Sequence, residues 1–81
     1  MNIYLFSFLE REQQEYIISE QGIFLATMEK DGLIFDLYQL ESFYVEFFYY
    51  LHDNEKIIVR CFNSPDELRP YLGLIDIDGL L

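Results

Sequence analysis

One carboxylate stands apart in the sequence because of its neighbours. Glu46 lies within residues 43–51, FYVEFFYYL, where every other side chain is aromatic or aliphatic. Burial in such a segment raises the pKa of a carboxyl group, and acid–base catalysis depends on shifts of this kind. Arg60 lies in the next apolar run and can become its partner across a strand pair. We expect a structural ion pair, with a ligand-binding or acid–base role for Glu46 as the alternative.

The other groups that could react are each present once. His52 is the only histidine, and it begins the stretch HDNE, which is typical of a turn. Cys61 is the only cysteine and shares its side of a predicted strand with two aliphatic residues, so we expect a small, buried residue, with a reactive thiol as the alternative. Neither has the nucleophile, base or ligand cluster that catalysis or metal binding requires. The sequence therefore predicts no catalytic residue, no metal site, no cofactor and no enzymatic activity.

The secondary structure that must position Glu46, Arg60 and the other candidate residues begins with a predicted N-terminal helix. Ser7 followed three residues later by Glu10 is a capping-box pattern, and apolar residues recur at helical spacing over residues 8–20. Gly22 offers the left-handed conformation that commonly closes a helix.

Strand-forming residues dominate the middle of the chain. Short turns separate the runs, and Lys30-Asp31-Gly32 is a strong hairpin signal. Because no connection is long enough to hold a helix, we expect an antiparallel meander of four strands. The strands are predicted at residues 23–28, 33–40, 43–51 and 56–63.

A second, shorter helix is predicted to follow the last strand. Ser64 is a suitable cap, Pro65 suits the first helical position, and Glu67 completes a capping box. Pro70 keeps this helix short or kinked before Gly73 ends it. Residues 74–78 alternate apolar and acidic, as an edge strand or an extended tail would. The fold class is thus α+β, in the order α-β-β-β-β-α, in one domain spanning residues 1–81.

Alternation along residues 43–51 places large rings on both faces of the sheet. If both helices cover one face, the other exposes an apolar patch with charged edges, which is typical of an interface. Alternatively, the helices and the tail divide themselves between the faces and bury both. The predicted interaction face consists of Tyr44, Glu46, Phe48, Tyr50, Ile58, Arg60 and Phe62.

Charge narrows the possible partners. The 81 residues include 15 acidic and 5 basic ones, a formal net charge of −10, which repels nucleic acid and anionic membranes. The acidity either keeps a hydrophobic sheet soluble or docks on a basic partner. The lone cysteine and the absence of a targeting motif or an apolar run of about 20 residues predict a cytoplasmic protein.

Three stretches of the sequence form a pattern: residues 13–17 leading to 22–26, residues 37–46, and residues 70–72 with 75–77. Together they resemble a family of small, acidic, uncharacterised proteins from Bacteroides-type gut bacteria. The middle stretch is the most specific part of the resemblance, which covers most of the chain. The resemblance implies a bacterial cytoplasmic protein and brings no activity, cofactor or partner with it.

The sequence favours a small, non-enzymatic protein–protein interaction module that forms a homodimer, or binds another protein, through the predicted interaction face. One alternative is a small-molecule binding or sensing domain with a pocket around Glu46 and Arg60. Another is an acidic decoy or immunity-type protein that occupies a basic partner. We expect no direct binding to nucleic acid or membrane.

Overall fold

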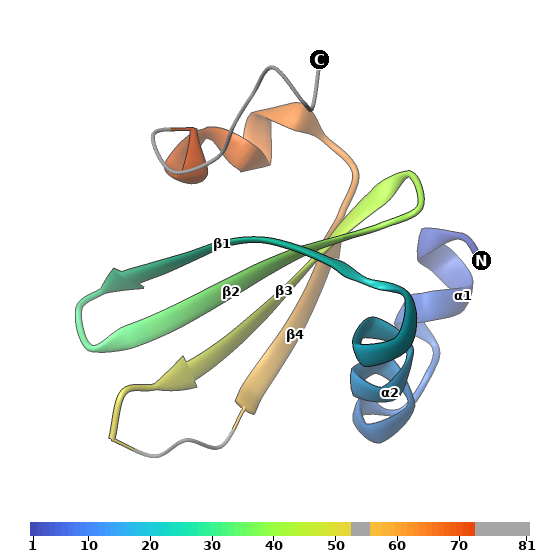
Figure 1. Ribbon diagram of the computed structural model, residues 1–81, viewed down its shortest axis with the longest axis horizontal. Helices are drawn as coiled ribbons and strands as arrows, with labels where there is room; N and C mark the ends of the chain where they lie inside the picture. The colour runs from blue at the N-terminus through green and yellow to red at the C-terminus, as the bar shows by residue number, and fades with distance from the viewer. Residues whose placement is uncertain (53–55, 73–81) are drawn as a thin grey trace.

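The computed structural model describes the backbone of residues 1–52 and 56–72, with their side chains except those of residues 56–59. The four strands form one antiparallel sheet in chain order, and the helices lie on both sides of it (Figure 1). The predicted α+β class and four-stranded meander are confirmed. The elements are α1 (Ile3–Ser7), α2 (Arg11–Gln21), β1 (Ile23–Lys30), β2 (Leu33–Leu40), β3 (Phe43–Tyr50), β4 (Lys56–Phe62) and the 3-10 helix η1 (Pro65–Tyr71).

Two tight turns set the register of the first three strands. Asp31 and Gly32 connect β1 to β2, both with positive φ, as the predicted hairpin requires. Glu41, between β2 and β3, also has a positive φ of 54°, which costs a residue with a Cβ about 1–2 kcal/mol. Its backbone carbonyl accepts from Gln39 Nε2 at 3.2 Å, and both of its carboxylate oxygens accept from the Met1 amino group at 3.0 Å. These contacts hold the turn in place.

The N-terminal helical region differs from the single helix predicted over residues 8–20, because it is divided into α1 and α2. Ser7 is not an N-cap, since its hydroxyl donates to the carbonyl of Ile3 at 2.6 Å. Glu10 is the N-cap of α2 and forms a capping box with Gln13, whose Oε1 accepts from the Glu10 backbone N–H at 3.1 Å. The predicted helix start was therefore wrong by about one turn.

Gly22 closes α2 for a different reason from the one predicted. Its φ is −74°, an extended conformation that any residue can adopt. A Cβ at this position would lie 2.7 Å from the carbonyl oxygen of Ile18. Space rather than backbone freedom requires glycine here.

The start of η1 matches the predicted helix start, with Ser64 as N-cap and proline in the first turn. The Ser64 hydroxyl accepts from the backbone N–H of Asp66 at 3.3 Å. Glu67 does not complete the predicted capping box, because its carboxylate accepts from Arg60 on β4. The predicted helix end at Gly73 and the tail at residues 74–78 lie outside the described residues.

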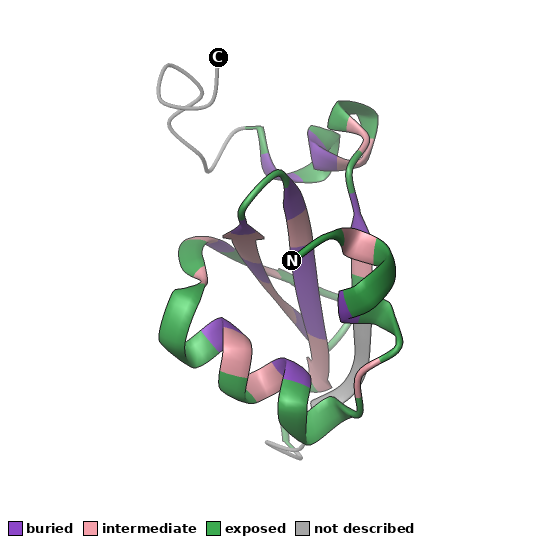
Figure 2. Cartoon of the chain, turned by 90° about the vertical axis from the view of Figure 1, so that its right-hand side faces the viewer, coloured by how far each residue is buried: buried purple, intermediate pink, exposed green. Residues whose placement is uncertain are grey.

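The sheet carries a hydrophobic core on each face, and the helices divide themselves between the two. We call the face of Phe43, Val45 and Phe47 the α-face, because α1 and α2 pack on it through Phe6 and Ile18. The opposite face, the η-face, is covered by η1. The η1 residues Leu68 and Tyr71 pack there against Ala26, Leu37 and Phe62. β3 is consequently buried or half-buried on both faces over all but its last residue, while the outer sides of the helices are exposed (Figure 2). The helices are thus divided as in the second of the two predicted arrangements, and the tail that this arrangement also included lies outside the described residues.

Candidate functional site

The predicted Glu46–Arg60 ion pair is confirmed. The two residues are directly opposite each other in the register of β3 and β4, so both side chains lie on the η-face. Arg60 Nε donates to Glu46 Oε1 at 3.1 Å. The Glu46 side chain is only 3% exposed, whereas that of Arg60 is 44% exposed. The pair thus joins a buried carboxylate to a cation at the edge of the sheet.

Two residues of η1 complete a carboxylate network with this pair. The Tyr71 hydroxyl donates to the second oxygen of Glu46, and Arg60 Nη1 donates to Glu67 Oε1 at 3.2 Å. Burial raises the pKa of Tyr71, as do the hydrogen bond to Glu46 and the negative charge of that residue. The phenol therefore stays protonated and remains a donor. The network binds η1 to the sheet.

The carboxylate network leaves little of Glu46 for a ligand. Each of its oxygens accepts a hydrogen bond from a protein donor. Tyr71, which covers it, is 1% exposed. Among the side chains that the structure describes, no buried polar atom lacks a partner. The geometry accounts for Glu46 as the residue that docks η1.

η1 covers the centre of the predicted interaction face. Phe62 is buried, and Tyr44 is half-buried with its ring stacked on Phe62 at 5.5 Å between centroids. Phe48 is half-buried against Phe35, with 4.7 Å between ring centroids. Tyr50, at 53% exposure, is the open ring among the described members of this face.

The remaining candidate residues are dispersed. His52 is exposed in the turn after β3. Cys61 packs beside the α-face core, and burial raises the pKa of its thiol, which disfavours the reactive thiolate. The side chain of Ile58 lies outside the described part of the chain. The structure does not bring His52 or Cys61 together with the carboxylate network into a reacting set.

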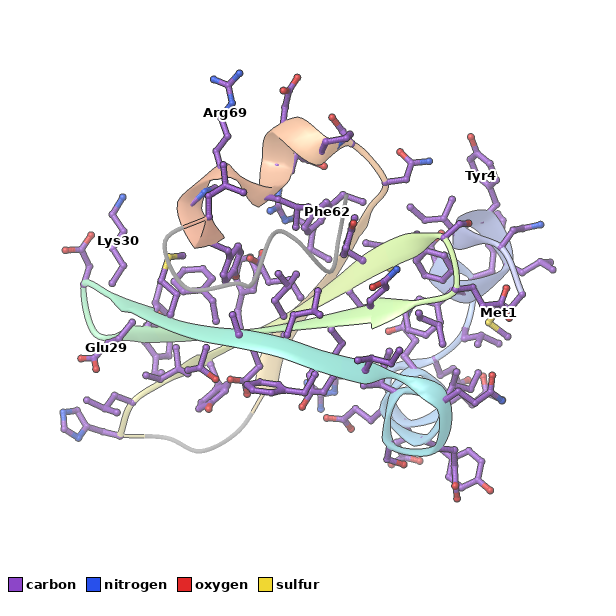
Figure 3. The ribbon with its side chains drawn as sticks, turned by 45° about the horizontal axis from the view of Figure 1, so that its top comes forward. Met1, Tyr4, Glu29, Lys30, Phe62 and Arg69 are labelled. Atoms are coloured by element: carbon purple, nitrogen blue, oxygen red, sulfur yellow. The ribbon has the colours of Figure 1, made fainter. Side chains whose placement is uncertain are left out.

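Several large apolar side chains are exposed on α1, at its C-terminal end and on α2, where the sequence predicted no binding residue. We call this set the helical surface; it consists of Tyr4, Leu5, Phe8 and Tyr16, which are 73%, 58%, 88% and 65% exposed. Tyr4 projects from α1 at the end of the molecule that also holds Met1 (Figure 3). The one-turn spacing of Tyr4 and Phe8 places them on one side of the chain, while Phe6 points into the core.

An apolar hollow of about 370 Å³ lies along α2 at the same end of the molecule. Tyr16 belongs both to this hollow and to the helical surface, and Glu12 is the one carboxylate in its lining. The lining residues are Met1, Leu9, Glu12, Gln13, Tyr16 and Ile17. A signal for this surface was present in the sequence, because residues 3–9 are apolar in all positions but one, and a five-residue helix cannot bury all its sides.

A second hollow, of about 390 Å³, lies between α1 and β4. Tyr4, Arg60 and Cys61 contribute to its more polar lining. Glu46 is not part of its wall, and the hollow lies on the α1 side of the sheet, whereas the carboxylate network lies on the η-face.

Comparison of the chain with protein-family models, with curated proteins and with solved structures finds no match. Within residues 1–52 and 56–72, no helix has the length and apolar character needed to cross a membrane. The functional inference therefore depends on the two hollows, the carboxylate network and the helical surface.

Proposed function

We propose that this chain is a small, non-enzymatic protein-interaction module that binds another protein through the helical surface. The observation that carries the proposal is the exposure of four large apolar side chains on α1, its C-cap and α2, one of which, Tyr16, also lines an apolar hollow. Single exposed apolar residues are common on monomers, but several on neighbouring elements together with a hollow are typical of a binding site.

The packing of the domain does not explain why these side chains are exposed. α1 and α2 reach the α-face core through Phe6 and Ile18, which point away from solvent. Leu5 and Phe8 belong to neither core cluster. Exposing them lowers solubility, which the net charge of −10 offsets. Such a compromise is favoured when the exposed groups are used for binding.

Self-association through the predicted interaction face is a second form of the same proposal. Among the members of that face that the structure describes, Tyr50 at the end of β3 is the aromatic ring left open with η1 in place. The small-molecule alternative expected a pocket around Glu46 and Arg60, and the hollow between α1 and β4 has Arg60 but not Glu46 in its wall. It supports a ligand site only away from the buried carboxylate. The net charge supports the acidic-decoy alternative. The lone cysteine and the Bacteroides-type resemblance lead us to place the module in a bacterial cytoplasm.

Selection from a random peptide display library tests the proposal, with the protein immobilised as bait. The surface variant is Leu5→Ser/Phe8→Ser. Its matched control is Tyr50→Ser/Leu51→Ser, which also replaces one exposed aliphatic and one exposed aromatic residue. Peptides enriched on the wild type should bind the surface variant at least tenfold more weakly, because truncation of an interface anchor commonly costs 1–2 kcal/mol or more.

The control variant should bind the same peptides within about twofold of the wild type, since small differences of this size are usual for substitutions outside a contact. Far-UV circular dichroism establishes that both variants keep the fold. Enriched peptides that bind the surface variant as tightly as the wild type would contradict the assignment of the helical surface. Loss of binding in the Tyr50→Ser/Leu51→Ser variant alone would move the binding site to the η-face.

A further inference from the structure

We infer that the partner inserts an apolar side chain of a basic amphipathic segment into the hollow along α2, with a cationic side chain on each side of that anchor. The inference rests on the proposed function and names the chemistry of the partner. It follows from the positions of the glutamates of α2 relative to the hollow.

Glu12 and Glu20 lie on the same side of α2 as the hollow. At about 100° per residue, Tyr16 is displaced by about 40° from Glu12 around the helix axis, and Glu20 by about 80°. Gln13 and Ile17, which line the hollow, lie at about 100° and 140° in the same sense. Both glutamates are exposed. The apolar lining therefore has one carboxylate towards each end of the helix.

The two carboxylates also define a spacing. Glu20 follows Glu12 by eight residues, which corresponds to about 12 Å along the helix axis. Tyr16 lies midway between them. A helical partner that pairs with both glutamates carries its basic residues about two turns apart, with the apolar anchor about midway between them. Lysine and arginine suit these outer positions because their long apolar stems can lie on the exposed rings.

The acidic charge of this region favours a basic partner segment over a second copy of the chain as the occupant of the hollow. Residues 1–22 contain four glutamates and one arginine, so two helical surfaces brought face to face would repel each other. The whole chain, at −10, adds to this repulsion. The negative charge also disfavours binding to nucleic acid and to anionic lipid headgroups. A basic peptide segment satisfies both the apolar hollow and its carboxylate edges.

Three synthetic 15-residue peptides test the inference by fluorescence anisotropy. The first has one leucine flanked on the same face by two lysines, one turn before it and one turn after it, so that the lysines lie two turns apart. The second has the same composition with the lysines moved to the opposite face, and the third has glutamates in place of the lysines. We expect the first peptide to bind at least tenfold more tightly than either of the others. Equal affinity for the first and second peptides would overturn the inference, because it would indicate attraction without a defined site.

Charge-neutralising variants locate the contact. Glu12→Gln/Glu20→Gln removes two exposed carboxylates beside the hollow, and Glu29→Gln/Asp31→Asn removes two at the distant β1–β2 hairpin; Glu29 lies far from Met1 in Figure 3. Affinity for the first peptide should fall about tenfold in the α2 variant and less than twofold in the hairpin variant. Equal losses in both variants would overturn the inference.

The display selection separates this inference from the proposed function. Enriched peptides that depend on Leu5 and Phe8 but carry no paired basic residues would refute the basic partner and leave the interaction module intact. If no enriched peptide depends on Leu5 and Phe8, both proposals fail. Dependence on the helical surface together with two basic residues flanking an apolar one is the result we expect.

Discussion

Removal of one oxygen atom, by Tyr71→Phe, tests how η1 is held on the sheet. The ring remains, so the substitution leaves the apolar packing of η1 in place and opens no large cavity. It deletes the hydrogen bond to Glu46, a carboxylate that is 3% exposed and receives its other hydrogen bond from Arg60. A hydrogen bond to a charged group contributes about 1.5–3 kcal/mol, and water has little access to replace this one. We expect a loss of about 2 kcal/mol in the free energy of unfolding.

That loss is a large fraction of the total, because a domain of 81 residues is expected to be stable by roughly 4–12 kcal/mol. Urea denaturation followed by far-UV circular dichroism measures it directly. Tyr16→Phe, at an exposed position of α2, is the matched control and should change the free energy of unfolding by less than about 0.5 kcal/mol.

A double-mutant cycle with Glu46→Gln isolates the pair. The amide oxygen of glutamine can still accept from Tyr71, but as a neutral acceptor, so the Tyr71→Phe substitution should cost about 1 kcal/mol in that background. Backbone amides of η1 should exchange hydrogen faster in the Tyr71→Phe variant than in the wild type, while those of β2 change less. A Tyr71→Phe variant within 0.5 kcal/mol of the wild type, with unchanged exchange in η1, would show that apolar packing alone holds this helix.

Three further predictions concern alkaline pH, the glycines and self-association. Because the folded state raises the pKa of Tyr71 above its ordinary value of 10.0, the unfolded chain loses the phenol proton at a lower pH than the folded chain. The free energy of unfolding should therefore fall as pH rises past about 10. Urea denaturation midpoints measured against pH should fall less steeply in the Tyr71→Phe variant, which lacks this phenol. Gly22→Ala should cost about 1–3 kcal/mol through the close contact with α2, and Gly32→Ala about 1–2 kcal/mol through its φ of +80°. Asparagine tolerates a positive φ, so Gly32→Asn should be more stable than Gly32→Ala, whereas Gly22→Asn should be no more stable than Gly22→Ala. Thermal melts of these four variants measure the differences. If the chain dimerises through the η-face, sedimentation velocity should give a dimer mass for the wild type and a monomer mass for Tyr50→Asp; a dimer that persists in this folded variant would exclude the Tyr50 end as the contact.

Local patterns predicted most of the fold because they reflect local physics. The Asp31-Gly32 turn follows from the positive φ values that a two-residue hairpin needs. Ser64 followed by Pro65 marked the start of η1, because a capping side chain and a proline suit only that position. Two-residue alternation also placed Glu46 and Arg60 on one face, and the register then paired them.

The errors arose where local patterns compete or where distant segments meet. Ser7 and Glu10 fit a capping box, but a better one lies three residues later at Glu10 and Gln13. The contact of Tyr71 with Glu46 joins residues 25 positions apart, and no local signal encodes which face η1 will cover. The helical surface escaped prediction because exposure of Phe8 depends on the break between α1 and α2.

Glu46 has a consequence for folding that goes beyond the docking of η1. In most half-buried sheets, a one-residue slip exposes apolar side chains to water and is rejected for that reason. β3 is apolar on both faces, so water penalises such a slip much less here. A slipped β3 would, however, place the carboxylate among the hydrocarbon side chains of the α-face, without Arg60 opposite it, and burial of an uncompensated charge costs several kcal/mol. Glu46 thus fixes which face of β3 packs against α1 and α2 and which packs against η1.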